Sequence, residues 1–456
     1  MKASRESKID PSGNARKGCF AKIKVPVGWD ATEFSEVFEF LPTNSFSRED
    51  MSYEIKANSY FNIHYGDIHA TFDEQILDFK KHINQIPVLI HAPKNIDKDS
   101  FLKDGDLIIA DASEDYAGVG ECIEIVNING RKVLSGLHTI AARDKTGRTQ
   151  KGFRAYLLNH PQVSINLKRI ATGSKVYGIS KANIAGLTLI IPPLPEQKNI
   201  ALILSTWDRA IEKTEQLIAQ KQKLKKGLMQ LLLTGKVRFK EFVKSKKMKK
   251  TKLGMVPEDW GFGEIGNLID FLSGFPFESS GYAKQGIRLL RGSNIKRGNT
   301  DWSPDITQFW ATETEELKPY KLKATDIVIA MDGSLVGRSF AQLTKADLPA
   351  LLLQRVARIR ASKIEIGFLK EYIGSDYFID YCDSIKTVTA IPHISSSDIK
   401  KFSIALPSAE EQKRIAVAMS TLERQIQLLH QSHSKLKIQK SGLMQQLLTG
   451  KIRVKI

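Results

Sequence analysis

Cysteine is scarce in this chain: its 456 residues include only Cys19, Cys122 and Cys382. No two of them have the close spacing that zinc ligands and thiol redox pairs share. A disulfide framework would need more cysteines and an oxidising compartment. We therefore expect no metal site and no disulfide, and we expect the protein in a reducing cytoplasm.

Long apolar runs are absent as well. No stretch approaches the roughly 18 consecutive apolar residues that a membrane-spanning helix needs. The first residues, Met1–Lys8, are polar and lack the apolar segment of a secretory signal. We therefore expect no membrane partner and no secretion.

Several enzyme signatures are missing. The Asn-Pro-Pro-Tyr motif of adenine methyltransferases and the HExxH motif of zinc peptidases do not occur. His430 and His433 lie three residues apart in a helical pattern but have no third ligand nearby in sequence. The segment Gly333–Ser339 is one residue too short for a phosphate-binding loop and has arginine where that loop needs lysine. The sequence thus favours a protein without catalytic residues of its own.

One nuclease-like pattern remains as an alternative. Asp305, Glu316 and Lys318 follow the order of a metal-dependent nuclease set. That chemistry needs the Glu and Lys on a strand beside the Asp, to hold a metal and activate water. Here Lys318 runs into Pro319, which favours a loop. A self-contained nuclease is therefore a second hypothesis, and a coiled-coil scaffold that binds only protein is a third.

Acidic residues are few in two stretches, and most of the net charge of +18 lies in these two stretches. Residues 196–250 contain 15 Lys and Arg against 5 Asp and Glu, and residues 408–456 contain 9 against 3. The segment 251–407 is balanced at 19 against 19. The excess base could meet DNA phosphates, an acidic partner subunit or only solvent, and the charge alone does not separate these readings.

What the chain does have is a repeat of itself. Residues 192–239 and 407–454 align without gaps at an offset of 215 residues and share 22 of 48 residues. This period is far longer than the 20–50 residues of a solenoid unit, so it indicates a duplicated half-molecule.

Each repeat predicts one long helix, because apolar residues recur every three and then four positions without proline after the first turn. An a/d series kept over more than four heptads is typical of a coiled-coil seam. Two separate amphipathic helices are the alternative. The predicted seam and partner-binding positions are Ile200, Leu204, Trp207, Ile211, Leu228, Leu232, Ile415, Met419, Leu422, Ile426, Leu443 and Leu447.

Short β-branched runs separated by Gly, Asn and Asp precede each helix and predict strands with tight turns. Examples are 105–110 and 325–330, with helices expected at 162–170 and 367–381. The fold class is therefore α+β, with two mixed α/β domains separated by two long helices, as a pseudo-twofold internal repeat. The predicted segments are 1–195, 196–247, 248–407 and 408–456.

The lead-in Pro193–Lys198 and the exit Gly227–Lys236, repeated at Pro407–Lys413 and Gly442–Lys451, resemble the DNA-specificity subunit of type I restriction-modification systems. The second lead-in departs slightly, reading Pro-Ser-Ala-Glu-Glu-Gln-Lys. The resemblance implies two target-recognition domains that each read half of a bipartite DNA site and are held apart by the two long helices, paired as an antiparallel coiled coil. It also implies two methyltransferase subunits on the helices, with motor-nuclease subunits joining them, and S-adenosylmethionine, ATP and Mg²⁺ in those partners.

Basic and polar residues near predicted turns are the candidates for contact with DNA, because arginine forks onto guanine in the major groove. Which of them contact bases and which contact phosphates is left open. The candidates are Arg143, Lys145, Arg148, Lys151, Arg154, Lys175, Tyr177, Lys181, Arg288, Arg291, Lys296, Arg297, Arg338, Lys386 and His393.

Overall fold

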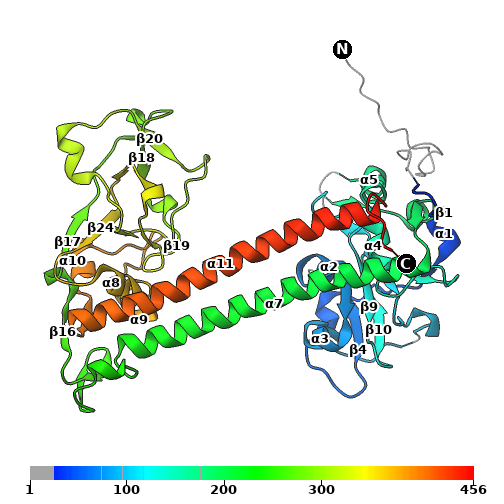
Figure 1. Ribbon diagram of the computed structural model, residues 1–456, viewed down its shortest axis with the longest axis horizontal. Helices are drawn as coiled ribbons and strands as arrows, with labels where there is room; N and C mark the ends of the chain where they lie inside the picture. The colour runs from blue at the N-terminus through cyan, green and yellow to red at the C-terminus, as the bar shows by residue number, and fades with distance from the viewer. Residues whose placement is uncertain (1–24, 73, 95, 117, 174–175, 456) are drawn as a thin grey trace. The chain divides into compact units, whose positions relative to one another are not determined.

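The computed structural model describes residues 25–72, 74–94, 96–116, 118–173 and 176–455 (Figure 1). The chain forms two compact units. Unit 1 comprises Met1–Thr214 and Ser432–Ile456, and unit 2 comprises Glu215–Gln431. Lys175, one of the candidate DNA contacts, lies outside the described residues.

Unit 1 is built on a five-stranded sheet in the order β2-β11-β7-β9-β5 and a four-stranded sheet in the order β10-β4-β6-β3. Its central strand, Leu107–Ala110, is fully apolar and is buried on both faces. The strands of the first sheet are β2 Phe38–Leu41, β5 Ile76–Asp78, β7 Leu107–Ala110, β9 Cys122–Val126 and β11 Thr139–Asp144. Those of the second are β3 Met51–Ser52, β4 Tyr60–Ile63, β6 Val88–Leu89 and β10 Lys132–Ser135.

Short helices and strand pairs cover these sheets. A core of aromatic and aliphatic side chains, among them Phe34, Phe38 and Tyr156, fills the space between the first sheet and the helices. The remaining elements are β1 Asp30–Glu33, α1 Phe34–Val37, α2 Tyr65–Ala70, α3 Phe79–His82, β8 Ala112–Ser113, α4 Arg154–Leu158, α5 Pro161–Ile170, β12 Tyr177–Gly178, α6 Lys181–Ala185 and β13 Thr188–Ile191.

Unit 2 repeats this plan with a five-stranded sheet, β17-β24-β21-β22-β19, and a three-stranded sheet, β20-β18-β23. The strands are β17 Ile269–Ser273, β18 Ile287–Leu290, β19 Arg297–Gly298, β20 Gln308–Trp310, β21 Ile327–Ala330, β22 Phe340–Gln342, β23 Ala350–Leu352 and β24 Val356–Ala361. The other elements are β14 Met248–Thr251, β15 Gly254–Pro257, β16 Gly261–Glu264, α8 Ile366–Ile373, α9 Asp376–Ile385, α10 Ser396–Lys401 and β25 Ser403–Leu406.

The strands predicted at 105–110 and 325–330 and the helix at 162–170 are confirmed. The single helix predicted over 367–381 is wrong, because the backbone turns at Gly374 and Ser375 and divides it into α8 and α9. Glycine at this turn approaches the ring of Phe340, and a Cβ there would stand 2.8 Å from Cζ. A side chain at this position would clash with the ring.

The two long helices are α7, Leu194–Leu233, and α11, Ala409–Leu448. Each is followed by a glycine in the left-handed conformation, Gly235 at φ 67° and Gly450 at φ 64°, which ends a helix readily. A Cβ at Gly235 would stand 2.4 Å from Pro257, and one at Gly450 would stand 2.5 Å from Pro26. The same close contact thus occurs in both units.

Within each unit the two helices run side by side and antiparallel (Figure 1). In unit 2, Lys225 binds Glu423 at 2.5 Å, and in unit 1, Lys440 binds Asp208. These are the same two repeat positions with the roles of the helices exchanged. The predicted seam positions are buried or half-buried throughout, from Ile200 and Leu204 to Met419 and Leu447. The antiparallel seam is therefore confirmed within each unit.

His160 provides a pH prediction for unit 1. It is 2% exposed, and its Nδ1 accepts a hydrogen bond from the Gln162 backbone N–H at 3.2 Å, which caps α5. Burial lowers the pKa of His160 to about 4. The unfolded chain takes up a proton near the usual value of about 6.5 and the folded chain does not, so stability falls as the pH drops through this window.

We expect the free energy of unfolding to fall by about 2 kcal/mol between pH 7 and pH 4.5 because of this residue. His160→Asn keeps a good helix cap without a titrating ring. The loss should therefore be smaller in that variant, as measured by urea denaturation at both pH values. An equal loss in both proteins would contradict the assignment.

Candidate nucleic-acid interface

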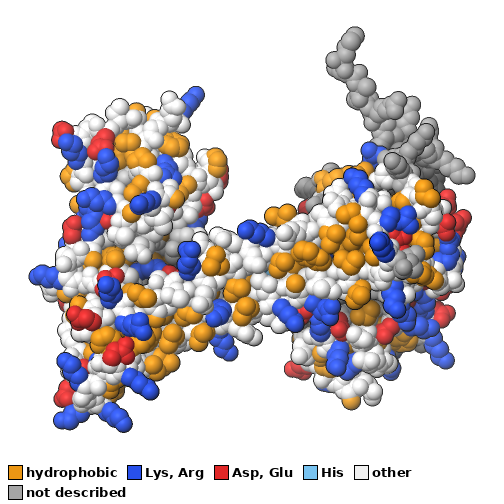
Figure 2. Space-filling view, in the orientation of Figure 1, with side chains coloured by type: hydrophobic (Ala, Val, Ile, Leu, Met, Phe, Trp, Pro, Cys, Tyr) orange, Lys and Arg blue, Asp and Glu red, His pale blue; other side chains and the backbone are white. Residues whose placement is uncertain are grey.

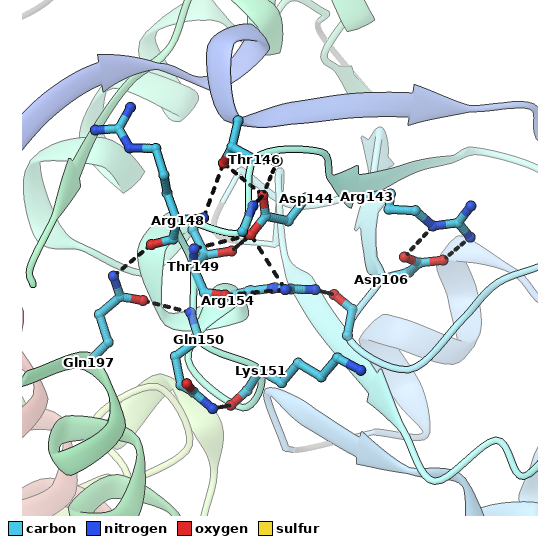
Figure 3. Close-up of polar contacts among 12 residues, drawn as sticks. Asp106, Arg143, Asp144, Thr146, Arg148, Thr149, Gln150, Lys151, Arg154 and Gln197 are labelled. Carbon is cyan, nitrogen blue, oxygen red and sulfur yellow. Dashed lines mark hydrogen bonds and ion pairs between the residues drawn. The ribbon is translucent and has the colours of Figure 1, made fainter. Parts of the chain in front are cut away.

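The basic loop predicted to contact DNA, residues 143–154, is folded around the carboxylate of Asp144 (Figure 3). Asp144 accepts hydrogen bonds from the backbone N–H groups of Thr146, Gly147 and Thr149, at 2.8, 2.9 and 3.0 Å. Although burial raises the pKa of Asp144, these bonds and those of the threonine hydroxyls lower it below its usual value. The loop therefore has a fixed internal structure.

The side chains of Arg154 and Arg143 form hydrogen bonds within their own domain. Arg154 is 8% exposed, and it donates to the carbonyl oxygens of Gly105 at 2.7 Å and Thr149 at 3.2 Å. Arg143 forks onto Asp106 at 2.9 and 2.6 Å, which raises the pKa of the guanidinium (Figure 3). Their buried geometry favours a structural role, so the two stay outside our proposed DNA contacts.

The second unit repeats the Arg143 fork with different residues. Arg360 of β24 binds Asp326 at 2.6 and 2.9 Å, just as Arg143 of β11 binds Asp106. In both units the carboxylate precedes the central apolar strand and the arginine lies on the strand beside it. Because the same ion pair occurs in both units, we assign it to the fold that they share.

Loop 143–154 is also tied to the start of α7. Gln197 accepts a hydrogen bond from the Gln150 backbone N–H at 2.7 Å and donates to the Arg148 carbonyl at 2.9 Å (Figure 3). Gln412 of α11 accepts in the same way from the Glu365 backbone N–H at 3.0 Å. This amide is part of the joint between a domain and its helix.

A second joint consists of Trp, Glu and Arg, and we call it the clamp. In unit 1, Glu196 accepts from the Trp29 indole at 2.9 Å and from both nitrogens of the Arg453 fork at 2.8 Å. Burial raises the pKa of Glu196, but these hydrogen bonds lower it by more, so the pKa lies below its usual value.

In unit 2, Glu411 accepts from Trp260 at 3.1 Å and from Arg238 at 2.9 and 2.8 Å. Each arginine also lies over its tryptophan ring, 5.5 Å from the centroid for Arg453 and 5.4 Å for Arg238. The clamp thus joins the domain opening, one helix start and the exit of the other helix in both units.

Unit 2 has a polar concavity of about 530 Å³ at one end of its main sheet. Two of the predicted residues, Arg291 and Lys296, line it. Sequence reasoning missed Arg355 and Gln354, which also line it and precede β24. The other lining residues are Tyr282, Gly292, Ser293, Ile295, Ala330, Asp332, Gly333, Ser334, Leu335, Ser339 and Leu353.

Arg355 has an uncommon backbone. Its φ is 64°, a left-handed conformation that a residue other than glycine rarely adopts. The side chain is 68% exposed and binds Asp332 at 3.3 Å. Strain of this kind gathers at functional sites, where the surrounding structure holds it in place.

Unit 1 has the equivalent residue in His138, which precedes β11 as Arg355 precedes β24. His138 has φ 55°, is 52% exposed, and lies 3.3 Å from Asp111 through Nδ1. Burial raises the pKa of Asp111, and the nearby His138 and Lys181 work against that rise. In both domains, the residue at this position has a left-handed backbone and an exposed side chain that contacts one aspartate.

Further polar and aromatic groups surround His138. The Tyr65 ring packs edge-on at 5.4 Å, and Tyr177 lies on β12, which pairs with β8 directly after Asp111. Of the predicted residues, Lys181 lies close enough to Asp111 to lower its pKa, and Tyr177 lies on the strand beside β8 with its ring against Tyr116. A neighbouring turn has the same geometry in the two units. The backbone N–H of His64 donates to the Asp67 carboxylate, and that of Arg291 donates to the Asn294 side-chain oxygen.

The remaining predicted residues lie elsewhere. Arg288 bonds the carbonyls of Ala346 and Leu348 and stacks on Trp302, and Arg297 borders a separate cavity beside α7. Arg338 and Lys386 both bind Asp383, which lowers the pKa of that carboxylate. Lys145 and Lys151 are exposed, and Arg148 pairs with Asp30. The backbone of His393 forms a β-bridge with that of Asp332, which lines the concavity. For these residues contact with DNA stays a prediction.

The nuclease-like trio is not assembled on a strand. Glu316 and Lys318 lie in a 3-10 helix, Glu315–Tyr320, where Lys318 pairs with Glu315. Asp305 lies in a separate turn after Trp302. Across the described part of the chain, no three His, Cys, Asp or Glu side chains gather as a metal site would require, and no helix is long and apolar enough to cross a membrane.

Comparison with known proteins agrees with this two-part architecture. A family model described as "Type I restriction modification DNA specificity domain" matches residues 26–222 and again 257–438. The specificity subunit of the type I restriction enzyme MjaVIII from Methanocaldococcus jannaschii is 31% identical over 294 residues, covering 63% of this chain and 68% of that protein. The EcoAI specificity subunit of Escherichia coli is 29% identical over 269 residues, covering 51% and 45%.

Solved structures have the same fold at lower identity. The S subunit of a type I system from M. genitalium matches with a TM-score of 0.54 and 13% identity, covering 96% of this chain and 99% of that chain. A chain from "Structural basis underlying complex assembly and conformational transition of the type I R-M system" matches at 0.55 and 18%, covering 94% and 100%. With the family model matching most of its length in two copies, the chain belongs to the type I restriction-modification DNA specificity family.

Proposed function

We propose that this chain is the DNA-recognition subunit of a type I restriction-modification complex and carries no catalytic site. Each mixed domain reads one half of a bipartite DNA site. The observation that carries the proposal is the pair of equivalent sites around His138 and Arg355, which share backbone geometry and differ in side chains. A shared backbone geometry with different polar side chains suits two domains that recognise different DNA sequences.

The chemistry of the two sites favours different bases. Arg291 and Arg355 offer planar guanidinium forks, which pair with the O6 and N7 acceptors of guanine in the major groove. The site in unit 1 offers the His138 imidazole and the phenol of Tyr65 instead. We therefore expect the two half-sites to differ, so that a perfectly palindromic recognition sequence would contradict the proposal.

The partners follow from the family. Two methyltransferase subunits would bind the long helices, and motor-nuclease subunits would join that complex in the cytoplasm. S-adenosylmethionine, ATP and Mg²⁺ would be bound by those partners. The basic helical segments and the absence of an assembled catalytic trio among the described residues support a binding role.

Replacing Arg355 by alanine should change recognition of one half-site alone. Loss of a bidentate base contact costs about 1–3 kcal/mol, so binding should weaken roughly 5- to 150-fold and selectivity at one position should relax. His138→Ala should affect the other half-site. Lys363→Ala, which removes an exposed charge of unit 2 outside the concavity, is the control. Binding of the assembled complex to DNA with single-base changes measures the effect, and equal losses in all three variants would argue against base reading.

The purified chain should neither cut nor methylate DNA. The reason is the dispersed placement of Asp305, Glu316 and Lys318, which leaves no paired ligands for a metal. Incubation of plasmid DNA with the chain and Mg²⁺ checks this. Metal-dependent cleavage that is lost in Asp305→Ala would establish the nuclease alternative, and absence of any salt-sensitive DNA binding would favour the protein scaffold.

A further inference from the structure

The loop 387–393 of unit 2 exposes an aliphatic side chain on an ordered backbone. The backbone N–H of Thr387 donates to the His393 carbonyl at 3.1 Å, and that of His393 donates to the Thr387 hydroxyl at 3.0 Å. Inside the loop, the Thr389 hydroxyl donates to the Ile391 carbonyl at 2.7 Å. Ile391 itself is 62% exposed. The loop therefore presents an apolar side chain to water from a backbone that its own hydrogen bonds fix.

The equivalent position of unit 1 is also apolar and exposed. Val176 lies 215 residues before Ile391 and is 52% exposed. The backbone around it is closed in the same way, because the Thr172 N–H donates to the Gly178 carbonyl at 3.0 Å. Single exposed aliphatic side chains are common on proteins, and Figure 2 shows others on this chain. A β-branched side chain exposed at the same position of both domains is a repeated feature, which indicates a contact that both domains make.

The loop 387–393 adjoins the concavity that Arg355 lines. The Pro392 carbonyl accepts a hydrogen bond from the backbone N–H of Gly333 at 3.0 Å, and Gly333 lines the concavity. Ile391 directly precedes Pro392 in the chain. Leu335, which is 58% exposed, adds a further aliphatic side chain to the lining. The surface around Arg355 therefore combines a guanidinium fork with apolar groups.

The major groove of DNA offers one apolar group among its polar base edges, the C5 methyl group of thymine. An arginine reads guanine through polar atoms and gains nothing from this methyl group. An aliphatic side chain gains by removing the methyl group from water, and it gains nothing from a phosphate. Because the loop is already ordered, little conformational entropy is lost when the contact forms. An aliphatic side chain beside an arginine that reads guanine thus suits a thymine beside that guanine.

We propose that Ile391 contacts the C5 methyl group of a thymine next to the base that Arg355 reads, and so selects thymine at that position. The inference rests on the proposed function and adds an apolar contact to the polar ones. It requires an A·T pair in the half-site that unit 2 reads. A half-site made only of G·C pairs would overturn it.

The test replaces each thymine of the recognition sequence in turn by uracil, which differs only in lacking the methyl group. Binding of the assembled complex should weaken about fourfold at one position of the half-site that Arg355→Ala affects, because burial of one methyl group contributes roughly that factor. Ile391→Ala should bind the thymine and uracil duplexes equally. Ile391→Val keeps a β-branched side chain and should retain the preference for thymine. The salt dependence of binding should not change in either variant, because no phosphate contact is lost.

Val388→Ala and Val243→Ala are matched controls, since each removes an exposed valine side chain of unit 2. Val388 lies in the same loop, but the equivalent position of unit 1 is a glycine, Gly173. Both control variants should therefore discriminate thymine from uracil as the wild-type chain does.

A preference for thymine that persists in Ile391→Ala would overturn the inference, as would a wild-type complex that binds every uracil duplex as tightly as the thymine duplex. Weaker binding of Ile391→Ala to both duplexes by the same factor would also overturn it and would indicate a side chain wedged between base pairs. Weaker assembly of this variant with unchanged DNA preference would overturn it as well and would identify the loop as a protein contact. A wild-type complex without any sequence preference would count against the proposed function itself.

Discussion

Replacing Glu411 by alanine is expected to destabilise unit 2 by about 3 kcal/mol, the cost of leaving a buried charge without its partner. The Arg238 and Glu411 side chains are 6% and 2% exposed. The Arg238 guanidinium therefore cannot replace the lost hydrogen bonds with bonds to water. The substitution also leaves the Trp260 indole N–H unpaired. Asp259, which binds Arg238 at 2.9 Å, retains part of the compensation. Hydrogen exchange of amides in unit 2 measures the loss.

Glu196→Ala in unit 1 should be milder, at about 1–2 kcal/mol. Its partner Arg453 is 43% exposed and can turn toward water once the carboxylate is gone. Glu410→Ala removes an exposed carboxylate beside Glu411 and is the control for charge alone. Equal losses for Glu196→Ala and Glu411→Ala would mean that burial of the arginine does not set the energy of the clamp.

The clamp also illustrates what the sequence could and could not predict. The long helices are predictable because their signal is local, with apolar residues at heptad spacing and no proline, and the repeat at Pro192 and Pro407 supports the period. The clamp unites residues far apart in the chain, such as Trp29, Glu196 and Arg453. No local pattern marks such a contact, although each member is repeated in the second half and that repetition is a signal in the sequence.

The candidate DNA contacts are less predictable for a related reason. A basic loop such as 143–154 has the same composition whether its arginines face solvent or an internal carboxylate. The signal that could separate these cases is the parallel pairing of Arg143 with Asp106 and Arg360 with Asp326. Arg355 is not among the predicted contacts because a left-handed backbone outside glycine leaves no trace in the sequence.

Lengthening both long helices by one heptad should lengthen the spacer between the half-sites by about 3 base pairs. Seven residues add roughly 10 Å of helix, and a DNA turn of about 34 Å contains about ten base pairs. The insertions belong between Asp208 and Lys225 in α7 and between Glu423 and Lys440 in α11, so that both interhelix ion pairs keep their partners. Because the recognition domains are untouched, base preferences within each half-site should not change.

An insertion of four residues in α7 alone is the contrasting variant. It rotates everything after it by about 40° beyond a full turn, which moves the seam residues out of register with α11. The Lys225–Glu423 and Lys440–Asp208 pairs can then no longer form together, so assembly with the methyltransferase subunits should weaken. Mapping the methylated motif in a host with the complete system measures both variants. A spacer that stays constant at full activity would mean that the partner subunits, and not these helices, set the separation of the half-sites.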